Sequence, residues 1–161
     1  MRVAVAVILL FSLAIAGGAE RKGIWPPFTP ETNHYARRLV TERFQIVTSL
    51  RDVDPEVLKL YYKIVPRRDI AVGTQPFAET DISDGHPNRF DFAGHGSDLW
   101  FIVYEVGGRA YHHSMILFQR SRSGWRRVAA AAGFPERSDF SSVVRAIKKG
   151  RFDTMTDASN L

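Results

Sequence analysis

Residues 98–132 read DLWFIVYEVGGRAYHHSMILFQRSRSGWRRVAAAA, and this stretch decides the expected fold. It begins with a run of β-branched and aromatic residues, Leu99–Tyr104, that has the length and composition of a strand. The glycines at 107 and 108 favour a two-residue type I′ turn, because both central positions of that turn need positive φ. The return strand would span Arg109–Gln119, and a polar turn at Ser121–Gly124 would lead into a third strand. We therefore predict three antiparallel strands connected as a meander.

Two helices are expected before this meander. From Glu31 to Leu50, apolar residues recur at spacings of three and four, which is typical of one face of an amphipathic helix. The β-branched cluster at residues 46–48 would also suit a strand. The second helix has clearer boundaries, because Asp54 is a good N-cap, Pro55 fits the first helical position, and Pro66 ends the apolar stripe.

The remaining pattern completes an α+β fold. Ile70–Val72 is expected as a short strand, Arg89–Phe92 as a strand before the meander, and Asp139–Lys149 as a helix capped by Ser138. Two N-terminal helices, an antiparallel four-stranded meander and a C-terminal helix follow in that order, which favours helices packed against one face of the sheet. A curved sheet of the cystatin or NTF2 kind is compatible with this order, but this analogy of fold implies no function.

The beginning of the chain has the features of an export signal. Arg2 is followed by an apolar run and by small residues that suit a cleavage site, and the run is too short for a membrane span. After cleavage no stable membrane span is expected. The expected segments are a Sec-type signal peptide at 1–19, an extended proline-containing segment at 20–30, a single α+β domain at 31–152 and a frayed tail at 153–161.

The composition limits the classes of function. The chain has no cysteine, which excludes disulfides, thiol catalysis, thiolate metal sites and a lipid-anchoring cysteine. A small exported domain without disulfides favours a bacterial periplasmic or secreted location. The formal net charge is +5, with Lys and Arg scattered along the chain. This charge is compatible with non-specific attraction to cell-wall polymers or lipid headgroups, whereas no nucleic-acid partner is expected.

One face of the predicted sheet is the expected binding surface. A two-residue turn would pair Val106 with Arg109 and Tyr104 with Tyr111, which sorts the side chains onto two faces. One face is nearly all apolar and should meet the helices, whereas the other mixes aromatic residues, Met and Arg, as protein interfaces do. The alternative is that the C-terminal helix or the loop at 73–87 covers this second face. The expected binding residues on it are Trp100, Tyr104, Tyr111, His113, Met115 and Arg126.

Histidines and carboxylates in the expected loops are candidates for metal binding or acid–base chemistry. Their spacing matches no metal motif, and no Gly-x-Ser-x-Gly elbow is present. The adjacent His112 and His113 would point to opposite faces of a regular strand and could not chelate one metal ion. The candidates are His86, His95 and Asp84, with Asp81, Asp91 and Asp98 close to them in the sequence.

Three functions from different classes stay open. The leading hypothesis is a periplasmic or secreted binding or inhibitor-type module that uses the aromatic face, with a protein or a small ligand of the cell envelope as its partner. The second is an exported hydrolase or metal-dependent enzyme that uses the loop histidines and aspartates. The third is a small-ligand carrier with a cavity near Ser114 and Ala129, where small side chains leave room. No cofactor is expected, and a homo-oligomer stays open.

Overall fold

The computed structural model describes most of the expected domain. The described residues are Pro30, 33–72, 74–80, 84–109, 111–134, 139–151 and 154–157. The expected signal peptide, most of the proline-containing segment and the expected cap Ser138 lie outside them. The described helices are α1 (His34–Thr41), α2 (Pro55–Ile64) and α3 (Phe140–Lys148), with 3₁₀ turns η1 (Leu50–Asp52) and η2 (Arg67–Asp69). The strands are β1 (Gln45–Val47), β2 (Ile70–Ala71), β3 (Asn88–His95), β4 (Leu99–Val106), β5 (His112–Ser121), β6 (Gly124–Phe134) and β7 (Thr154–Asp157).

The strands form one open, mostly antiparallel sheet. Its order is β1-β3-β4-β5-β6-β7, and β2 adds in parallel beside the first residues of β3. The predicted four-stranded antiparallel meander is confirmed as β3–β4–β5–β6. Within the expected tail, β7 pairs with β6 along Ala129–Ala132.

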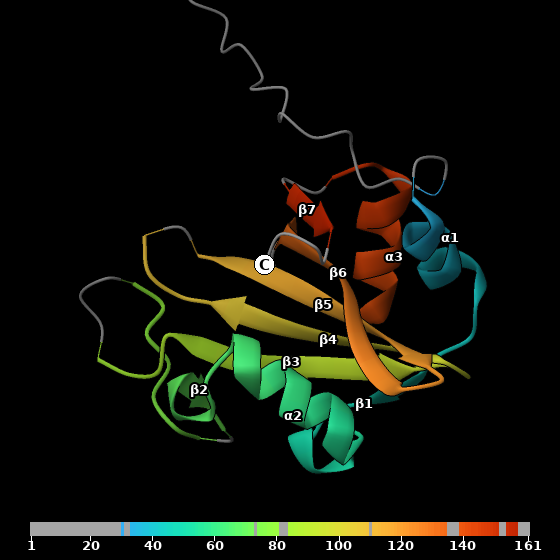
Figure 1. The fold of residues 1–161 in the computed structure, drawn as a ribbon. Helices are drawn as coiled ribbons and strands as arrows, with labels where there is room; N and C mark the ends of the chain where they lie inside the picture. Colours follow the sequence, from blue (N-terminus) through green and yellow to red (C-terminus); the bar gives the residue numbers. More distant parts are fainter. Residues whose placement is uncertain are drawn as a thin grey trace, which may run out of the picture.

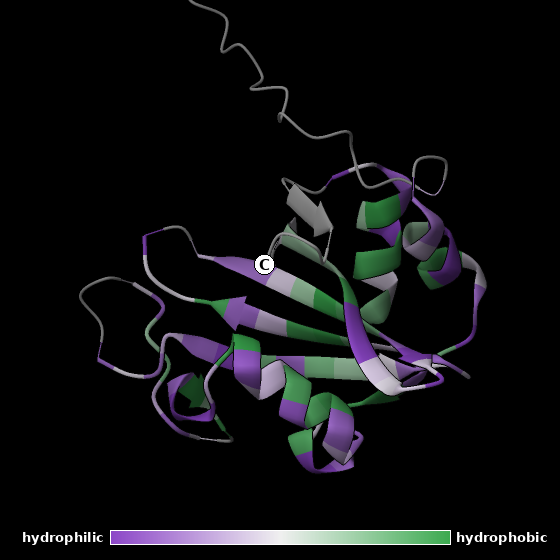
Figure 2. Cartoon of the chain, in the orientation of Figure 1, coloured by the Kyte–Doolittle hydropathy of each residue, from purple (hydrophilic) through white to green (hydrophobic). Residues whose placement is uncertain are grey.

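Helices cover both faces of the sheet. Figure 1 shows α1 and α3 on one side and α2 on the other, so the prediction that all helices share one face is wrong. The middle of the central strands is largely hydrophobic, as Figure 2 shows, because each face meets its own helix layer. The core on the α1–α3 side includes Leu39, Phe101, Val103, Met115, Leu117 and Ile147. The core on the α2 side includes Val57, Tyr61, Trp100, Ile102, Ile116 and Phe118.

The helix boundaries follow from local capping. The Asn33 side chain accepts hydrogen bonds from the first turn of α1, and Asp54 caps α2 as predicted. Asp139, rather than the expected Ser138, is the N-cap of α3. The single helix predicted over 31–50 is wrong, since α1 ends at Thr41 and β1 pairs with β3 instead. The β-branched pair Ile46–Val47 suits this strand, which is the alternative that the sequence leaves open.

The pairing of β4 with β5 is three residues away from the predicted register. Tyr104 lies opposite Ser114 instead of Tyr111. Because side chains alternate along a strand, an odd shift moves every residue of β5 to the other face. Met115 therefore belongs to the α1–α3 core, and Ile116 lies with Trp100 on the α2 side.

A close backbone contact explains this difference. Only the second of the two glycines has positive φ, 94° at Gly108, whereas a type I′ turn needs positive φ at both. A side chain at Gly107 would place its Cβ 1.7 Å from the carbonyl oxygen of Ala78, and the Gly107 amide donates to Pro87 at 2.8 Å. The first glycine thus allows two loops to touch, and β4 ends at Val106 while β5 begins only at His112.

Candidate functional site

The six predicted binding residues do not share one surface. Met115 is buried in the α1–α3 core, whereas Trp100 and Tyr104 pack on the α2 side. Arg126 is exposed beside the β5–β6 turn. The expected aromatic face is therefore covered, although by α2 rather than by the C-terminal helix. The remaining two predicted residues, Tyr111 and His113, do lie together, with ring centroids 5.6 Å apart.

These two residues belong to one end of the sheet that we call the loop end. We define the loop end as η2, β2, the described parts of residues 72–87 and 107–111, and the strand ends beside them. In Figure 1 both connections lie at the same end as the label of β2. Backbone hydrogen bonds join its parts, because the amide of Ala78 donates to the carbonyl of His86 at 2.9 Å and that of His86 donates to Pro76 at 2.9 Å.

A charged network holds the centre of the loop end. The Arg89 guanidinium donates two hydrogen bonds to the carboxylate of Glu105, at 2.9 and 2.6 Å, and the Tyr111 hydroxyl donates to the same carboxylate at 2.8 Å. The Glu105 side chain is only 9% exposed, whereas that of Arg89 is 40% exposed. Burial by itself would raise the pKa of the Glu105 carboxyl, but the hydrogen bonds from Arg89 and Tyr111 outweigh it and lower this pKa.

Aromatic rings complete this network. The Arg89 guanidinium lies 4.5 Å from the centre of the Phe77 ring, a cation–π distance, and Phe77 meets Tyr111 edge to face. Burial and the hydrogen bond to Glu105 raise the pKa of the Tyr111 hydroxyl to about 12, so Tyr111 is a neutral donor at physiological pH. Tyr111 is thus an exposed residue whose hydroxyl is hydrogen-bonded to the buried carboxylate of Glu105.

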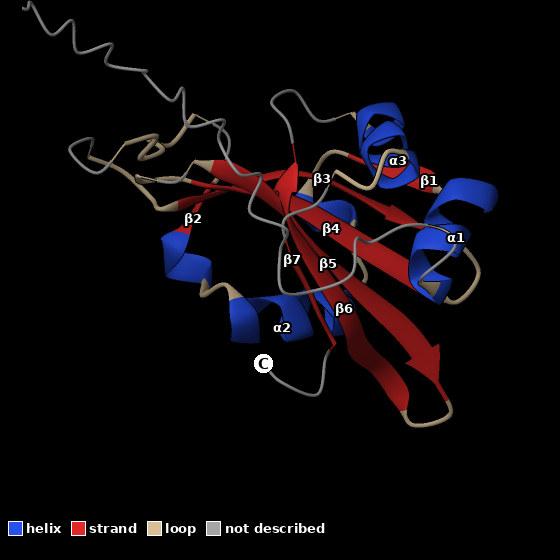
Figure 3. Cartoon of the chain, turned by 90° about the horizontal axis from the view of Figure 1, so that it is seen from above, coloured by secondary structure: helices blue, strands red, loops and turns tan. Residues whose placement is uncertain are grey.

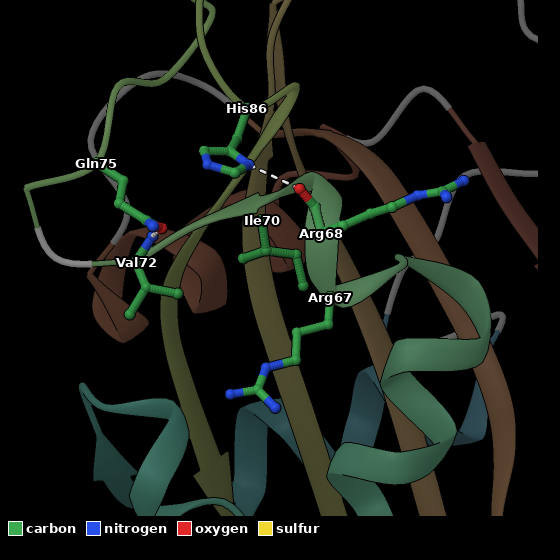
Figure 4. A pocket seen from close by; sticks show the side chains of 6 residues that line it. All are labelled: Arg67, Arg68, Ile70, Val72, Gln75 and His86. Carbon is green, nitrogen blue, oxygen red and sulfur yellow. Dashed lines mark hydrogen bonds between the residues drawn. The ribbon is translucent and has the colours of Figure 1, made fainter.

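An open pocket of about 600 Å³ lies at the loop end, between η2, β2 and His86 (Figure 4). Two apolar side chains, Ile70 and Val72, contribute to its lining, and His86 Nδ1 is 2.8 Å from the carbonyl oxygen of Arg68. Figure 4 shows the Arg68 side chain pointing away from Val72 and Gln75. An apolar surface beside a guanidinium suits a group with an apolar body and a carboxylate. The lining residues are Arg67, Arg68, Ile70, Val72, Gln75 and His86.

The candidates for metal binding or acid–base chemistry are not brought together. His86 and His95 lie at opposite ends of β3, and the His95 ring stacks on Trp100 with centroids 4.6 Å apart. Asp84 is exposed, and Asp98 accepts hydrogen bonds from Arg38. Within the described residues, no three His, Asp or Glu side chains form a group that could hold a metal ion.

His113 and its neighbour His112 occupy different environments. His113 is buried, and its Nε2 lies 3.9 Å from the Asp91 carboxylate, whereas His112 is half-buried. Asp81 lies outside the described residues.

The expected carrier cavity near Ser114 and Ala129 is not a single space. Ser114 lies opposite Tyr104, which packs on the α2 side, whereas Ala129 belongs to the α1–α3 core. The sheet therefore separates the two residues.

Among the described helices, none has the length and apolar character to cross a membrane.

Three residues of the loop end were missed as site residues: Phe77, Arg89 and Glu105. The signal for Glu105 was present, because a lone carboxylate at the end of an apolar strand is rarely buried without a cationic partner.

Comparison with known proteins adds no relative, since no protein-family model, curated protein or solved structure matches the chain.

Proposed function

We propose that this protein is an exported binding module of the bacterial cell envelope and that the loop end is its contact surface for a partner protein. The observation that carries this proposal is the exposure of apolar side chains. Among the described residues, three large hydrophobic side chains are exposed, and two of them, Val72 and Tyr111, lie at the loop end. Exposed Tyr and Arg side chains around an apolar patch are typical of binding hot spots.

The rigidity of Tyr111 supports the same proposal. Its hydroxyl is bound to Glu105, which is itself held by two hydrogen bonds from Arg89. An anchor that is ordered before binding loses less conformational entropy when the complex forms. Tyr111 is 38% exposed, so it can still bury surface against a partner.

The charges of the loop end favour a partner with carboxylates. Arg67, Arg68 and Arg109 are exposed there, and the pocket between Arg67 and Val72 combines a guanidinium with apolar walls. Arginine binds carboxylates with two parallel hydrogen bonds, which gives orientation as well as affinity. A carboxylate side chain with apolar neighbours is the contact that this surface fits best.

The test is a pull-down from a cell-envelope extract with residues 20–161, followed by affinity measurement on the purified partner. Tyr111→Ala removes the anchor, and Ile46→Ala is the matched control because Ile46 is a similarly exposed apolar residue on β1, away from the loop end. We expect Tyr111→Ala to weaken binding by at least ~30-fold, which corresponds to the ~2 kcal/mol of a hot spot. The control should bind as the wild type does. Equal affinity of the folded Tyr111→Ala variant would refute this assignment.

A further inference from the structure

The turn between β5 and β6 carries an unusual concentration of arginine. Four of the eight residues from 120 to 127 are arginines, and none is acidic. We call this segment the arginine hairpin. Figure 3 shows the end of the β5–β6 pair projecting past the helices, and Figure 2 colours it as mainly hydrophilic. The turn itself is tight, since Ser121 lies opposite Gly124.

The side chains of this segment are mostly available to solvent. Arg120, Arg122 and Arg126 are exposed, and no ion pair between described residues involves any of them. The Arg120 guanidinium lies 5.9 Å from the ring centre of half-buried Trp125. The acidic residue of α2 closest to the hairpin is Glu56. Its Oε2 would lie 3.9 Å from a Cβ atom placed on Gly124. A second carboxylate, that of Asp98, lies beside Gln119 and is already paired with Arg38, so these two acidic groups still leave the arginine hairpin positive.

The register spreads these charges around the tip. Arg120 lies opposite Trp125, at the edge of the α2 side, and Arg126 lies opposite Gln119, which accepts a hydrogen bond from Tyr35 of α1. Arg122 is in the turn between them. The guanidinium groups therefore extend from both faces and from the end of a projecting hairpin, rather than into a common pocket. A convex array of cations fits an extended anionic surface better than it fits one small anion.

We propose that the arginine hairpin binds the anionic headgroups of a phospholipid membrane. Juxtamembrane Lys and Arg side chains are attracted by anionic lipids, and a Trp side chain suits the membrane–water interface. The contact is electrostatic and peripheral, so it weakens as salt rises. Because the start of β4 lies beside the hairpin and its end lies at the loop end, a membrane-bound chain would present the loop end away from the lipid. This inference does not depend on the proposed partner.

The test is flotation of residues 20–161 with vesicles of phosphatidylglycerol and phosphatidylcholine, beside vesicles of phosphatidylcholine alone. The variant Arg120→Gln/Arg122→Gln/Arg126→Gln removes three charges from the hairpin. We expect a loss of roughly fivefold in vesicle affinity for each arginine, or about 100-fold in total. The matched control removes three exposed charges from α3 and the residue after it, as Arg145→Gln/Lys148→Gln/Lys149→Gln.

The outcomes separate a specific surface from a general effect of charge. Selective binding to the anionic vesicles that the hairpin variant loses and the α3 variant keeps would support the proposal. Equal losses in the two triple variants, equal binding to phosphatidylcholine alone, or binding to soluble polyphosphate without binding to the anionic vesicles would overturn it. If the hairpin variant does not fold, the single change Arg122→Gln in the turn serves instead, with roughly fivefold weaker binding expected. Tyr111→Ala should bind vesicles as the wild type does, which keeps this test independent of the partner.

Discussion

Replacing Arg89 by alanine should destabilise the protein and expose the role of the buried carboxylate of Glu105. The change removes both guanidinium hydrogen bonds to Glu105 and the contact with the Phe77 ring. The Tyr111 hydroxyl would be left as the remaining partner within this network. A carboxylate that is buried without its counter-ion is unfavourable, because the protein interior solvates charge less well than water does.

The size of the loss follows from the burial of the two partners. Breaking a fully buried ion pair costs about 3–5 kcal/mol, and breaking an exposed pair costs about 0–1 kcal/mol. Here the Glu105 side chain is 9% exposed and that of Arg89 is 40% exposed, so the pair is intermediate. We expect a loss of about 2–3 kcal/mol in the free energy of unfolding near neutral pH. For a domain of this size this corresponds to a decrease of roughly 10 °C in Tm.

The loss should depend on pH, with a defined sign. In the wild type the folded-state pKa of Glu105 is lowered, so its contribution to stability is present above the unfolded value of about 4.3 and is lost as the pH falls through the folded value. In Arg89→Ala, burial acts without the guanidinium and should raise this pKa. The variant would then take up a proton on folding. Its deficit relative to the wild type should therefore shrink as the pH falls from neutral toward about 4.

The assay is urea unfolding followed by tryptophan fluorescence, at neutral pH and near pH 4, for wild type, Arg89→Ala, Glu105→Gln and the double variant. The double variant should recover part of the stability that Arg89→Ala loses, because no carboxylate is left buried at position 105. Its stability relative to Glu105→Gln should be the same at both pH values, since neither protein has the Glu105 carboxyl to titrate. A loss under about 0.5 kcal/mol, as an ordinary surface substitution gives, or an equal loss at both pH values would refute the reasoning.

Two further substitutions test other parts of the structure. Trp100→Ala should lower the free energy of unfolding by about 3–5 kcal/mol in a urea titration, because the Trp100 side chain is buried in the core on the α2 side and stacks on His95. A variant as stable as the wild type would show that this face of the sheet is open. Gly107→Ala should lower Tm and increase hydrogen exchange of the Ala78 amide, because its Cβ would meet the Ala78 carbonyl and separate the two loops. Wild-type exchange at Ala78 would contradict the close contact of these loops.

Much of the fold could be predicted because residues at the ends of several helices and strands mark where those elements begin or end. Asp54 and Pro55 begin α2 as expected, and the turn before Gly124 connects β5 to β6. The β-branched and aromatic run that forms β4 was also recognised. Capping hydrogen bonds, fixed proline φ and side-chain shape act over a few residues, so they can be read from neighbouring residues alone.

The expected binding residues lie in different parts of the structure. Tyr111 and His113 lie at the loop end, but Trp100, Tyr104 and Met115 lie in the two cores. The error came from the register, because a shift by an odd number of residues exchanges the faces of β5. The network around Glu105 was missed for a different reason, because it depends on the pairing of Arg89 in β3 with Glu105 in β4 and on the approach of Tyr111 from the following connection.

The sequence alone determined the local elements and the class of the fold. The alternating and helical apolar patterns leave the chain few ways to bury its hydrophobic surface, and these patterns predict the α+β class and the order of α2, the four-stranded meander and α3. Only the tertiary structure decided that residues 45–47 form a strand, that helices cover both faces, and that β5 pairs three residues away from the expected register. Each of these outcomes depends on contacts between distant segments. The clearest is the approach of Gly107 to Ala78, where the absence of a side chain matters only because another loop lies against it.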